Sequence, residues 1–496
     1  MVNFFSYSNV YFVPEVFLML SLSFLLPLCV SFTNIYIGVG RNFSLQVRDI
    51  VILFFFLLGY LYFNASDIVH ILLASQIIKD TLSVYFILLV FFGVISVCIF
   101  SKNYLVNNFV YEFEFFIIFI IIFLGSSTVI FSNDLFSIYL GIELQSLGLY
   151  ILASYKQNSL YSTEAGVKYF VLGAFASSLL LVSFCLLYGA TGLTNLLDIS
   201  VFQVLLENIY LDFFLGISFF FMFIGLIFKI GGAPFHVWVP DVYEGVGTVV
   251  TAFFSLVPKV AIVSFIFKSF DVYSNGGSLD ICLMFSVSGF LSIFVGTIGA
   301  LSQITFKRLL SYSAISHSGF ILFSFSALNL SSLHSVLLYL LIYIIVIINI
   351  FGILLQFVQN RKVSLVKLVS NLRYYYLENK YGCIMLVVSF FSIAGVPPLS
   401  GFFAKFFIFF SCISAGYIVL SFFLILLSVI GFIYYLRVIR SLMLFQNNNK
   451  RLLFNRNFKD VSAYIVCYSF YINVTFFVMG GPFVFYLYNI CLYYFY

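Results

Sequence analysis

Long apolar runs recur along the whole chain, and they constrain its fold more than any other feature. About fourteen runs, most of them near 20 residues long, are almost free of charged side chains. Hydrophobic residues make up 63% of the 496-residue chain and charged residues only 8%, against roughly 25% charged in soluble domains. Too little polar surface remains to cover a water-soluble globule. The sequence therefore predicts an all-α polytopic membrane protein, because helices satisfy their own backbone hydrogen bonds across a bilayer.

The predicted spans leave only short connections between them. The first seven are Val16 to Ser31, Val51 to Phe63, Thr81 to Phe100, Phe115 to Phe131, Leu135 to Tyr155, Ala165 to Gly189 and Phe213 to Trp238. The second seven are Thr251 to Phe270, Ile281 to Leu301, Leu309 to Leu328, Leu337 to Phe357, Ile384 to Phe410, Gly416 to Ile439 and Ala463 to Tyr488. The polar stretches between them are only loop-sized, so no separate soluble domain is predicted.

The basic residues of the loops test this arrangement. Apart from Lys79 and Lys268, every loop Lys or Arg follows an odd-numbered run. Cytoplasmic or matrix-side loops carry such an excess of positive charge, so both termini are expected on the opposite side. The abundance of Phe, Ile, Leu, Tyr and Asn suggests an AT-rich organellar gene. In a mitochondrion, both termini would therefore face the intermembrane space.

Several function classes are disfavoured by the same sequence. The basic residues form no continuous face, so nucleic-acid binding has no support. The eight cysteines are scattered, with no two at CxxC spacing, and are read as small hydrophobes rather than cluster or zinc ligands. Two short glycine patterns resemble the start of a dinucleotide fingerprint, but Phe43 and Val250 occupy the third glycine position. We therefore expect no NADH-binding site and no other cofactor on this chain.

Four charged residues lie well inside the predicted spans, and a charge at the bilayer centre costs roughly 2.5–3.5 kcal/mol on insertion scales. They are Glu143 in the fifth span, Lys229 in the seventh, Lys259 in the eighth and Lys405 in the twelfth. A carboxylate that approaches or leaves a buried lysine changes the affinity of that lysine for a proton. Glu143 close to Lys229 would form such a switch, with Lys259 as a storage site and Lys405 as the exit-side site. The alternatives are static ion pairs between helices and, for Lys259, snorkelling to an interface.

Helix-breaking residues accompany all three lysines. Lys229 is followed by Gly231, Gly232 and Pro234, Pro258 precedes Lys259, and a second break at Gly395, Pro397 and Pro398 precedes Lys405. Unwound backbone at membrane depth is tolerated only where protein buries it or water fills a cavity. The breaks therefore favour a wet proton path, although glycine and proline are common in membrane helices generally.

Other titratable residues are weaker candidates for a relay or for proton uptake. His236 lies two turns after Lys229 if the helix continues, and His317 lies among serines that suit ordered water. A packing role with one satisfied hydrogen bond explains each of these two histidines about as well as a relay role does. Lys168 follows Glu164 by four residues, so a local helix pair is their first explanation, with a place on an uptake path as the second.

The motifs around these residues resemble the antiporter-like membrane subunits of respiratory complex I. The resemblance runs from about Asp134 to Lys405. Its motifs are LGIELQSLGLY (Leu140 to Tyr150), EAGVKYFVLGAFA (Glu164 to Ala176), FKIGGAPFHVWVPDVYEG (Phe228 to Gly245), VPK (Val257 to Lys259), KRLLSYSAISHSG (Lys307 to Gly319) and GVPPLSGFFAK (Gly395 to Lys405). Within the family, Lys405 disfavours the subunit 4 branch and the absence of a lateral helix disfavours the subunit 5 branch. The subunit 2 branch is the most similar.

The resemblance implies a bundle of 14 helices built from two inverted five-helix repeats, with the seventh and twelfth helices broken. The implied division is 1–131 for N-terminal helices, 132–270 for the first repeat, 271–410 for the second repeat and 411–496 for C-terminal helices. Glu143, Lys229, Lys259 and Lys405 match the proton-translocating positions of the family, and His236 and His317 match residues near its water file.

The function that this resemblance implies is proton translocation in the membrane arm of complex I, in the mitochondrial inner membrane. The chain would be a non-redox core subunit of the proton-translocating NADH:ubiquinone reductase. NADH, flavin, iron–sulfur clusters and quinone are then expected on other subunits, and bound phospholipids on this one. Other antiporter-like and small membrane subunits are the expected partners. The alternatives are a subunit of a multisubunit cation/proton antiporter and a scaffold that has lost pumping, but a scaffold predicts decay of the buried charges.

Overall fold

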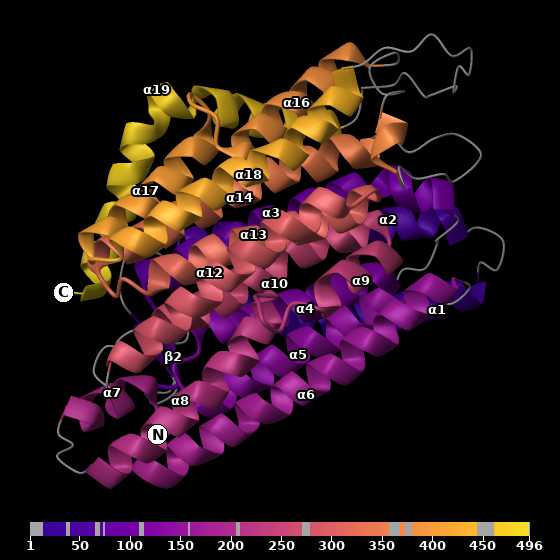
Figure 1. Ribbon diagram of the computed structural model, residues 1–496. Helices are drawn as coiled ribbons and strands as arrows, with labels where there is room; N and C mark the ends of the chain where they lie inside the picture. The colour runs from indigo at the N-terminus through magenta and orange to yellow at the C-terminus, as the bar shows by residue number, and fades with distance from the viewer. Residues whose placement is uncertain are drawn as a thin grey trace.

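Long α-helices packed side by side form the body of the molecule (Figure 1). This computed structural model describes residues 13–35, 40–64, 70–72, 75–108, 114–156, 159–204, 209–269, 278–356, 368–372, 379–443 and 461–495. In these ranges the only paired strands form a short antiparallel hairpin, β1 (His70–Leu72) and β2 (Ile77–Lys79). The predicted all-α class is therefore confirmed.

The helices follow the predicted apolar runs closely. The N-terminal part has α1 (Val13–Ile35), α2 (Gly40–Asn64), α3 (Thr81–Asn108) and α4 (Glu114–Phe131). The next part has α5 (Leu135–Ser154), α6 (Leu160–Thr191), α7 (Leu196–Val204), α8 (Ile209–Ile230), α9 (Trp238–Gly245) and α10 (Thr248–Lys268). The remainder has α12 (Ser278–Ser302), α13 (Phe306–Phe325), α14 (Leu330–Gln356), the 3₁₀ turn η3 (Val369–Leu372), α16 (Lys380–Ala394), α17 (Ser400–Ser414), α18 (Ile418–Met443) and α19 (Val461–Phe495).

Every predicted span overlaps a helix, but the number of spans is not settled by the fold. Within the described ranges, eleven helices are long and apolar enough to cross a membrane. Three further apolar segments are shorter, at Val13–Pro27, Lys380–Ala394 and Ser400–Ser414. The last two are the halves of one predicted span. Helix α13 is less apolar than most of the other helices because it carries Lys307 and Arg308 in its first turn and several serines after them. The count of fourteen therefore stays a prediction.

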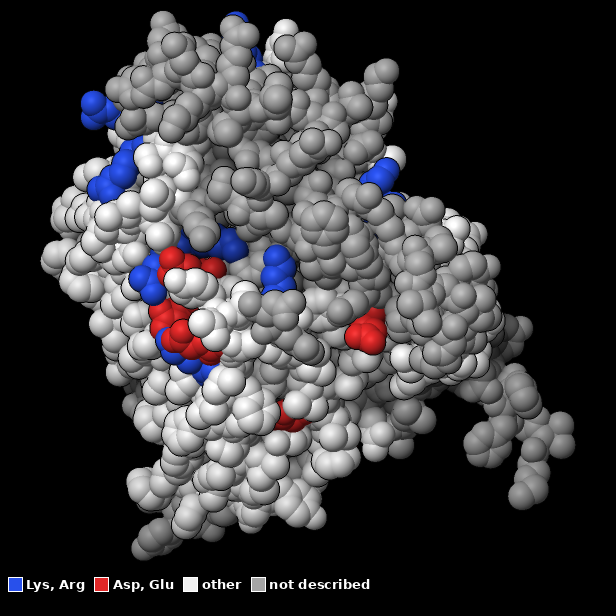
Figure 2. Space-filling model, turned by 90° about the vertical axis from the view of Figure 1, so that its right-hand side faces the viewer, with Lys and Arg blue, Asp and Glu red and all other residues white. Residues whose placement is uncertain are grey.

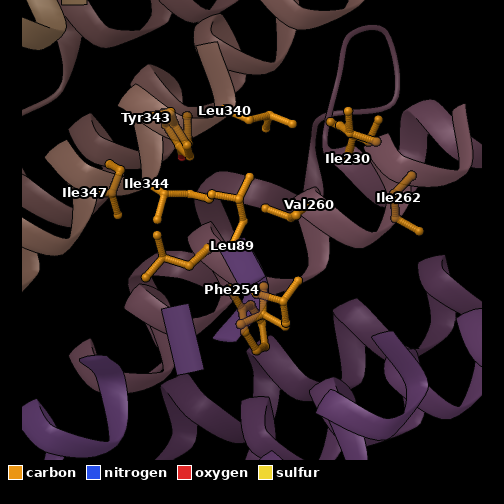
Figure 3. Close-up of a cluster of buried hydrophobic side chains, with 14 of the residues drawn as sticks. Leu89, Ile230, Phe254, Val260, Ile262, Leu340, Tyr343, Ile344 and Ile347 are labelled. Atoms are coloured by element: carbon orange, nitrogen blue, oxygen red, sulfur yellow. The ribbon is translucent and has the colours of Figure 1, made fainter. Parts of the chain in front are cut away.

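Helix α10 lies at the centre of the bundle. Its membrane-spanning window is entirely buried inside the protein, and it packs against α3, α4, α8 and α14. A helix that is apolar all round is stable only when other helices surround it. Figure 3 shows this core, where Leu89 of α3, Val260 of α10 and Ile344 of α14 lie together.

The seventh and twelfth predicted spans are each broken into two helices, as the sequence predicted. The first break separates α8 from α9, and the second separates α16 from α17. Each opening residue is a glycine with positive φ, Gly231 at 80° and Gly395 at 91°. A left-handed residue after the last helical turn ends a helix, and glycine adopts this conformation without a Cβ clash. The prolines that follow in each break prevent the first helix from resuming.

The hairpin formed by β1 and β2 ties the N-terminal helices together. Lys79, on β2 and only 2% exposed, forms an ion pair with Glu15 of α1 at 2.6 Å. The Tyr62 hydroxyl of α2 donates to the same carboxylate at 3.2 Å. Burial lowers the pKa of the Lys79 ammonium, while Glu15 opposes that shift. Lys79 was expected in a solvated loop, but the strand directs its side chain between α1 and α2.

Candidate functional site

Five of the candidate residues lie on five different helices. Glu143 is on α5, Lys229 in the last turn of α8, Lys259 on α10, His317 on α13 and Lys405 on α17. Lys229, Lys259 and His317 are less than one-tenth exposed, whereas Glu143 and Lys405 are partly buried. Such buried polar groups need partners inside the protein, and those partners define the chemistry of the site.

Glu143 and Lys229 are linked through hydroxyl groups on α5. Ser146 Oγ lies 3.4 Å from a Glu143 carboxylate oxygen, and Tyr150 follows Ser146 by four residues on the same helix. Lys229 Nζ lies 3.5 Å from the Tyr150 hydroxyl and faces its ring, 5.9 Å from the centroid. Residues 143, 146 and 150 share one face of α5 because their spacings are three and four residues. The hydroxyls of Ser146 and Tyr150 therefore lie between the two charged residues, and the ion pairs of the described residues include none between Glu143 and Lys229.

Lys259 reaches across the centre of the bundle from α10 to α13. Its ammonium donates to the carbonyl of Ala314 at 2.9 Å and lies 5.6 Å from the centroid of the Tyr343 ring. The side chain is 5% exposed. This geometry excludes the snorkelling alternative, because the amine points into the bundle rather than toward an interface.

His317 is held by two tyrosines from different helices. Its Nδ1 lies 2.6 Å from the hydroxyl of Tyr339 on α14, and its Nε2 lies 3.2 Å from the hydroxyl of Tyr435 on α18. A neutral imidazole donates through one nitrogen and accepts through the other, so this arrangement can pass a proton in either direction. A small cavity adjoins the ring, lined also by Tyr343, Ser392 and Lys405, with space for about one water molecule.

Lys405 is bound at the broken end of α16. Its ammonium donates to the carbonyl of Ala394 at 2.9 Å, and Phe320 faces it with a ring centroid 5.5 Å away. Ala394 is the last residue of α16, where carbonyls have no partner further along the helix. The partial negative charge of a helix C-terminus stabilises a cation there. The break therefore supplies the acceptor that an uninterrupted helix would have used itself.

No carboxylate pairs with the three central lysines within the described ranges. The ion pairs found there join other residues, and the lysines instead contact Tyr150, Ala314 and Ala394. Static ion pairing between helices, the alternative reading of these residues, therefore does not describe this conformation.

His236 does not extend the helix face that carries Lys229. Helix α8 ends at Ile230, and His236 lies in the break before α9, partly exposed. Its Nδ1 lies 3.2 Å from the carbonyl of Pro234. The spacing argument for a relay assumed a continuous helix, so it fails, and a role for His236 rests on the family resemblance alone.

Glu164 and Lys168 form the local helix pair that their spacing predicted, 2.7 Å apart. They belong to a surface cluster that we call the charged cluster, made of Glu164, Lys168, Asp241, Glu244 and Arg308. Asp241 of α9 contacts Lys168 at 3.1 Å and Arg308 of α13 at 3.2 Å, and Arg308 contacts Glu244 at 2.5 Å. Figure 2 shows acidic and basic side chains gathered on this face. The cluster joins α6, α9 and α13 at the surface, whereas Lys229 and Lys259 are buried.

Sequence reasoning missed two kinds of residue. Tyr150, Tyr339 and Tyr435 complete the polar contacts of the lysines and of His317, but they are inconspicuous among 35 tyrosines. Their only signal was position, since Tyr150 lies seven residues after Glu143 on the same helix. Lys268, expected in a loop, is a buried residue at the end of α10 and donates to the carbonyl of Ser132 at 3.2 Å.

The segment of the sequence that carries the breaks and the buried lysines matches one protein family. Residues 132–431 match the family described as NADH:quinone oxidoreductase/Mrp antiporter, TM. The chain belongs to this family. The match begins just before α5 and ends inside α18, so it includes all five buried candidates.

Two named relatives are similar to this chain over about two thirds of its length. NADH-quinone oxidoreductase subunit N from Wolbachia sp. subsp. Brugia malayi is 40% identical over 342 residues, which cover 68% of this chain and 71% of the relative. NADH-ubiquinone oxidoreductase chain 2 from Marchantia polymorpha is 37% identical over 358 residues, which cover 70% of each chain. These similarities confirm the resemblance to the antiporter-like membrane subunits of complex I.

A solved structure shares the fold over nearly the whole chain. A chain of respiratory complex I from Thermus thermophilus superposes with a TM-score of 0.77 at 24% identity, covering 96% of this chain and 98% of the other. The superposition extends beyond residues 132–431, so the N-terminal and C-terminal helices also belong to the shared architecture.

Proposed function

We propose that this chain is a proton-translocating, antiporter-like subunit of the complex I membrane arm. The observation that carries the proposal is the placement of Lys229, Lys259 and Lys405 in the bundle without a carboxylate partner in the described ranges. An ammonium held only by a hydroxyl or a carbonyl can release its proton without leaving an isolated carboxylate behind. Ionisable residues inside membrane helices are rare and mark ion pathways and proton relays.

The contacts suggest an order for proton transfer. A proton on Glu143 moves through the hydroxyls of Ser146 and Tyr150 to Lys229. The proton next reaches Lys259. The Tyr343 ring contacts both the Lys259 amine and the His317 ring. From His317 the proton crosses the adjoining cavity to Lys405. Water molecules bridge the gaps that direct hydrogen bonds do not span.

The rest of the complex would supply the driving force. The expected site chemistry on this chain is proton transfer alone, with NADH, flavin, iron–sulfur clusters and quinone on other subunits. A conformational signal from quinone reduction would move Glu143 relative to Lys229 and so change the proton affinity of the lysine. We place the chain in the mitochondrial inner membrane, with both termini on the intermembrane-space side and with other antiporter-like subunits, small membrane subunits and phospholipids as neighbours.

The alternative is a subunit of a multisubunit cation/proton antiporter, which the family also includes. Complex I is favoured because relatives that are 37–40% identical are named as its subunits. Separation of native membrane complexes distinguishes the two. Co-migration of this chain with NADH:quinone oxidoreductase activity supports complex I, and migration in a smaller assembly without that activity supports the exchanger.

A lysine substitution tests the proton path itself. Lys229→Ala removes a proton site from the polar path without disturbing the apolar helix contacts. We expect an assembled complex that translocates fewer protons per electron. Lys380→Ala, at the exposed start of α16, is the matched control and should leave this ratio unchanged. An unaltered ratio in Lys229→Ala would refute the proposed role.

A further inference from the structure

Asn473, on the C-terminal helix α19, contacts both sides of the break between α16 and α17. Its Nδ2 donates to Ser392 Oγ at 3.0 Å, and its Oδ1 accepts from Ser400 Oγ at 2.5 Å. Ser392 lies in the last turn of α16, and Ser400 is the first residue of α17. One fully buried amide therefore joins the two helix ends that form the break.

The environment of Asn473 argues against an incidental polar residue. Its neighbours along α19 include strongly exposed apolar side chains, such as Phe477 at 63% and Val478 at 77%, whereas Asn473 is 0% exposed. An apolar residue would serve for packing alone, because burying an amide is unfavourable unless its hydrogen bonds are made. Here both the donor and the acceptor of the amide are used, and both partners belong to the break.

The same two helix ends approach each other very closely. A Cβ on Gly401 would lie 1.7 Å from the carbonyl oxygen of Ser392, so α17 begins directly against the last turn of α16. Ser392 and Gly401 also line the cavity shared with His317 and Lys405. Ala394, which accepts from the Lys405 ammonium at 2.9 Å, lies two residues after Ser392. A shift of the α16 end would therefore move the acceptor of Lys405.

We propose that Asn473 is a positioning residue that fixes the α16–α17 break and thereby holds Lys405 and its acceptor Ala394 in place for proton transfer. This inference rests on the proposed proton path. It gives the C-terminal helices, which lie outside the two repeats that the resemblance implies, a part in the mechanism. Asn473 acts through Ser392 and Ser400, so the effect of replacing Asn473 depends on those serines.

The test uses the assembled complex with single and double substitutions. Asn473→Leu keeps the number and branching of the side-chain heavy atoms and removes both hydrogen bonds. We expect it to assemble, and to lower the rate of coupled proton translocation by about tenfold, the equivalent of one or two lost hydrogen bonds. Its pH–activity profile should also shift, because the surroundings of Lys405 change. Ser469→Ala is the matched control, since the Ser469 hydroxyl, one turn earlier on α19, bonds only to the carbonyl of Val466.

A double substitution separates positioning from packing. If Asn473 acts through Ser392, then Ser392→Ala combined with Asn473→Leu should lose no more activity than Asn473→Leu alone, whereas independent effects would add. Additive losses, or an Asn473→Leu complex that pumps like Ser469→Ala with the same pH profile, would overturn the inference. Lys405→Ala distinguishes a failure of the proposed proton path from a failure of the role of Asn473. If Lys405→Ala and Asn473→Leu both leave pumping intact, the proton path is wrong. If Lys405→Ala reduces pumping and Asn473→Leu does not, only the role of Asn473 is wrong.

Discussion

Replacing Tyr150 by phenylalanine removes one hydroxyl and should interrupt the link between Glu143 and Lys229. That hydroxyl lies 3.5 Å from Lys229 Nζ, and Ser146, which contacts Glu143, lies one turn earlier on the same face of α5. The aromatic ring stays, so its edge-on contact with Tyr169 at 4.8 Å between centroids is preserved. The substitution therefore changes the polar connection while leaving the packing of α5 against α6 intact.

The expected size of the effect follows from this geometry. A hydrogen bond to a charged group contributes about 1.5–3 kcal/mol. The 3.5 Å separation between the Lys229 amine and the hydroxyl is long for such a bond, so the lower end applies. About 1.4 kcal/mol corresponds to a factor of about ten in rate or occupancy. We therefore expect proton transfer from Glu143 to Lys229 to slow about tenfold in Tyr150→Phe.

The assay is proton translocation by the complex in sealed vesicles, measured per electron passed to quinone. Native electrophoresis must first show normal assembly. Tyr169→Phe is the control, because Tyr169 is a buried tyrosine of the same aromatic group whose ring stacks on Trp238 and lies tilted against Phe254. If both variants give the same proton-to-electron ratio as the unsubstituted complex, the hydroxyl chain is not the route between Glu143 and Lys229.

Two further predictions concern stability, read from thermal unfolding in detergent. Lys79→Met removes the charge and keeps much of the apolar stem, so the Glu15 carboxylate loses its cationic partner and keeps only the Tyr62 hydroxyl. We expect a loss of about 2–3 kcal/mol. Because Glu15 is 23% exposed, water limits that loss, and a change below about 0.5 kcal/mol would show that the ion pair contributes little. Asp241→Asn breaks two contacts in the charged cluster, where side chains are 34–61% exposed. Solvent screening should keep its effect below about 1 kcal/mol, and a loss of several kcal/mol would contradict the surface assignment.

Positions that depend on local chemistry were predictable from the sequence. The breaks were predicted because glycine supplies positive φ and proline cannot continue a helix, and Gly231 and Gly395 adopt that conformation. The Glu164–Lys168 pair was predicted because residues four apart on a helix are neighbours. The alignment of His236 with Lys229 fails for the opposite reason, since it needed a continuous helix and the glycines end α8 at Ile230.

The sequence by itself determined the membrane class, the helices, the two breaks and the charged residues that a bilayer would not otherwise tolerate. Those features follow from hydropathy and backbone chemistry, which act over a few residues. Only the tertiary structure decided which groups meet. Tyr150 lies against Lys229, Ala314 against Lys259, and Asn473 against Ser392 and Ser400. These contacts join helices far apart in the chain, and the packing of all the apolar faces together sets them, which no local pattern records.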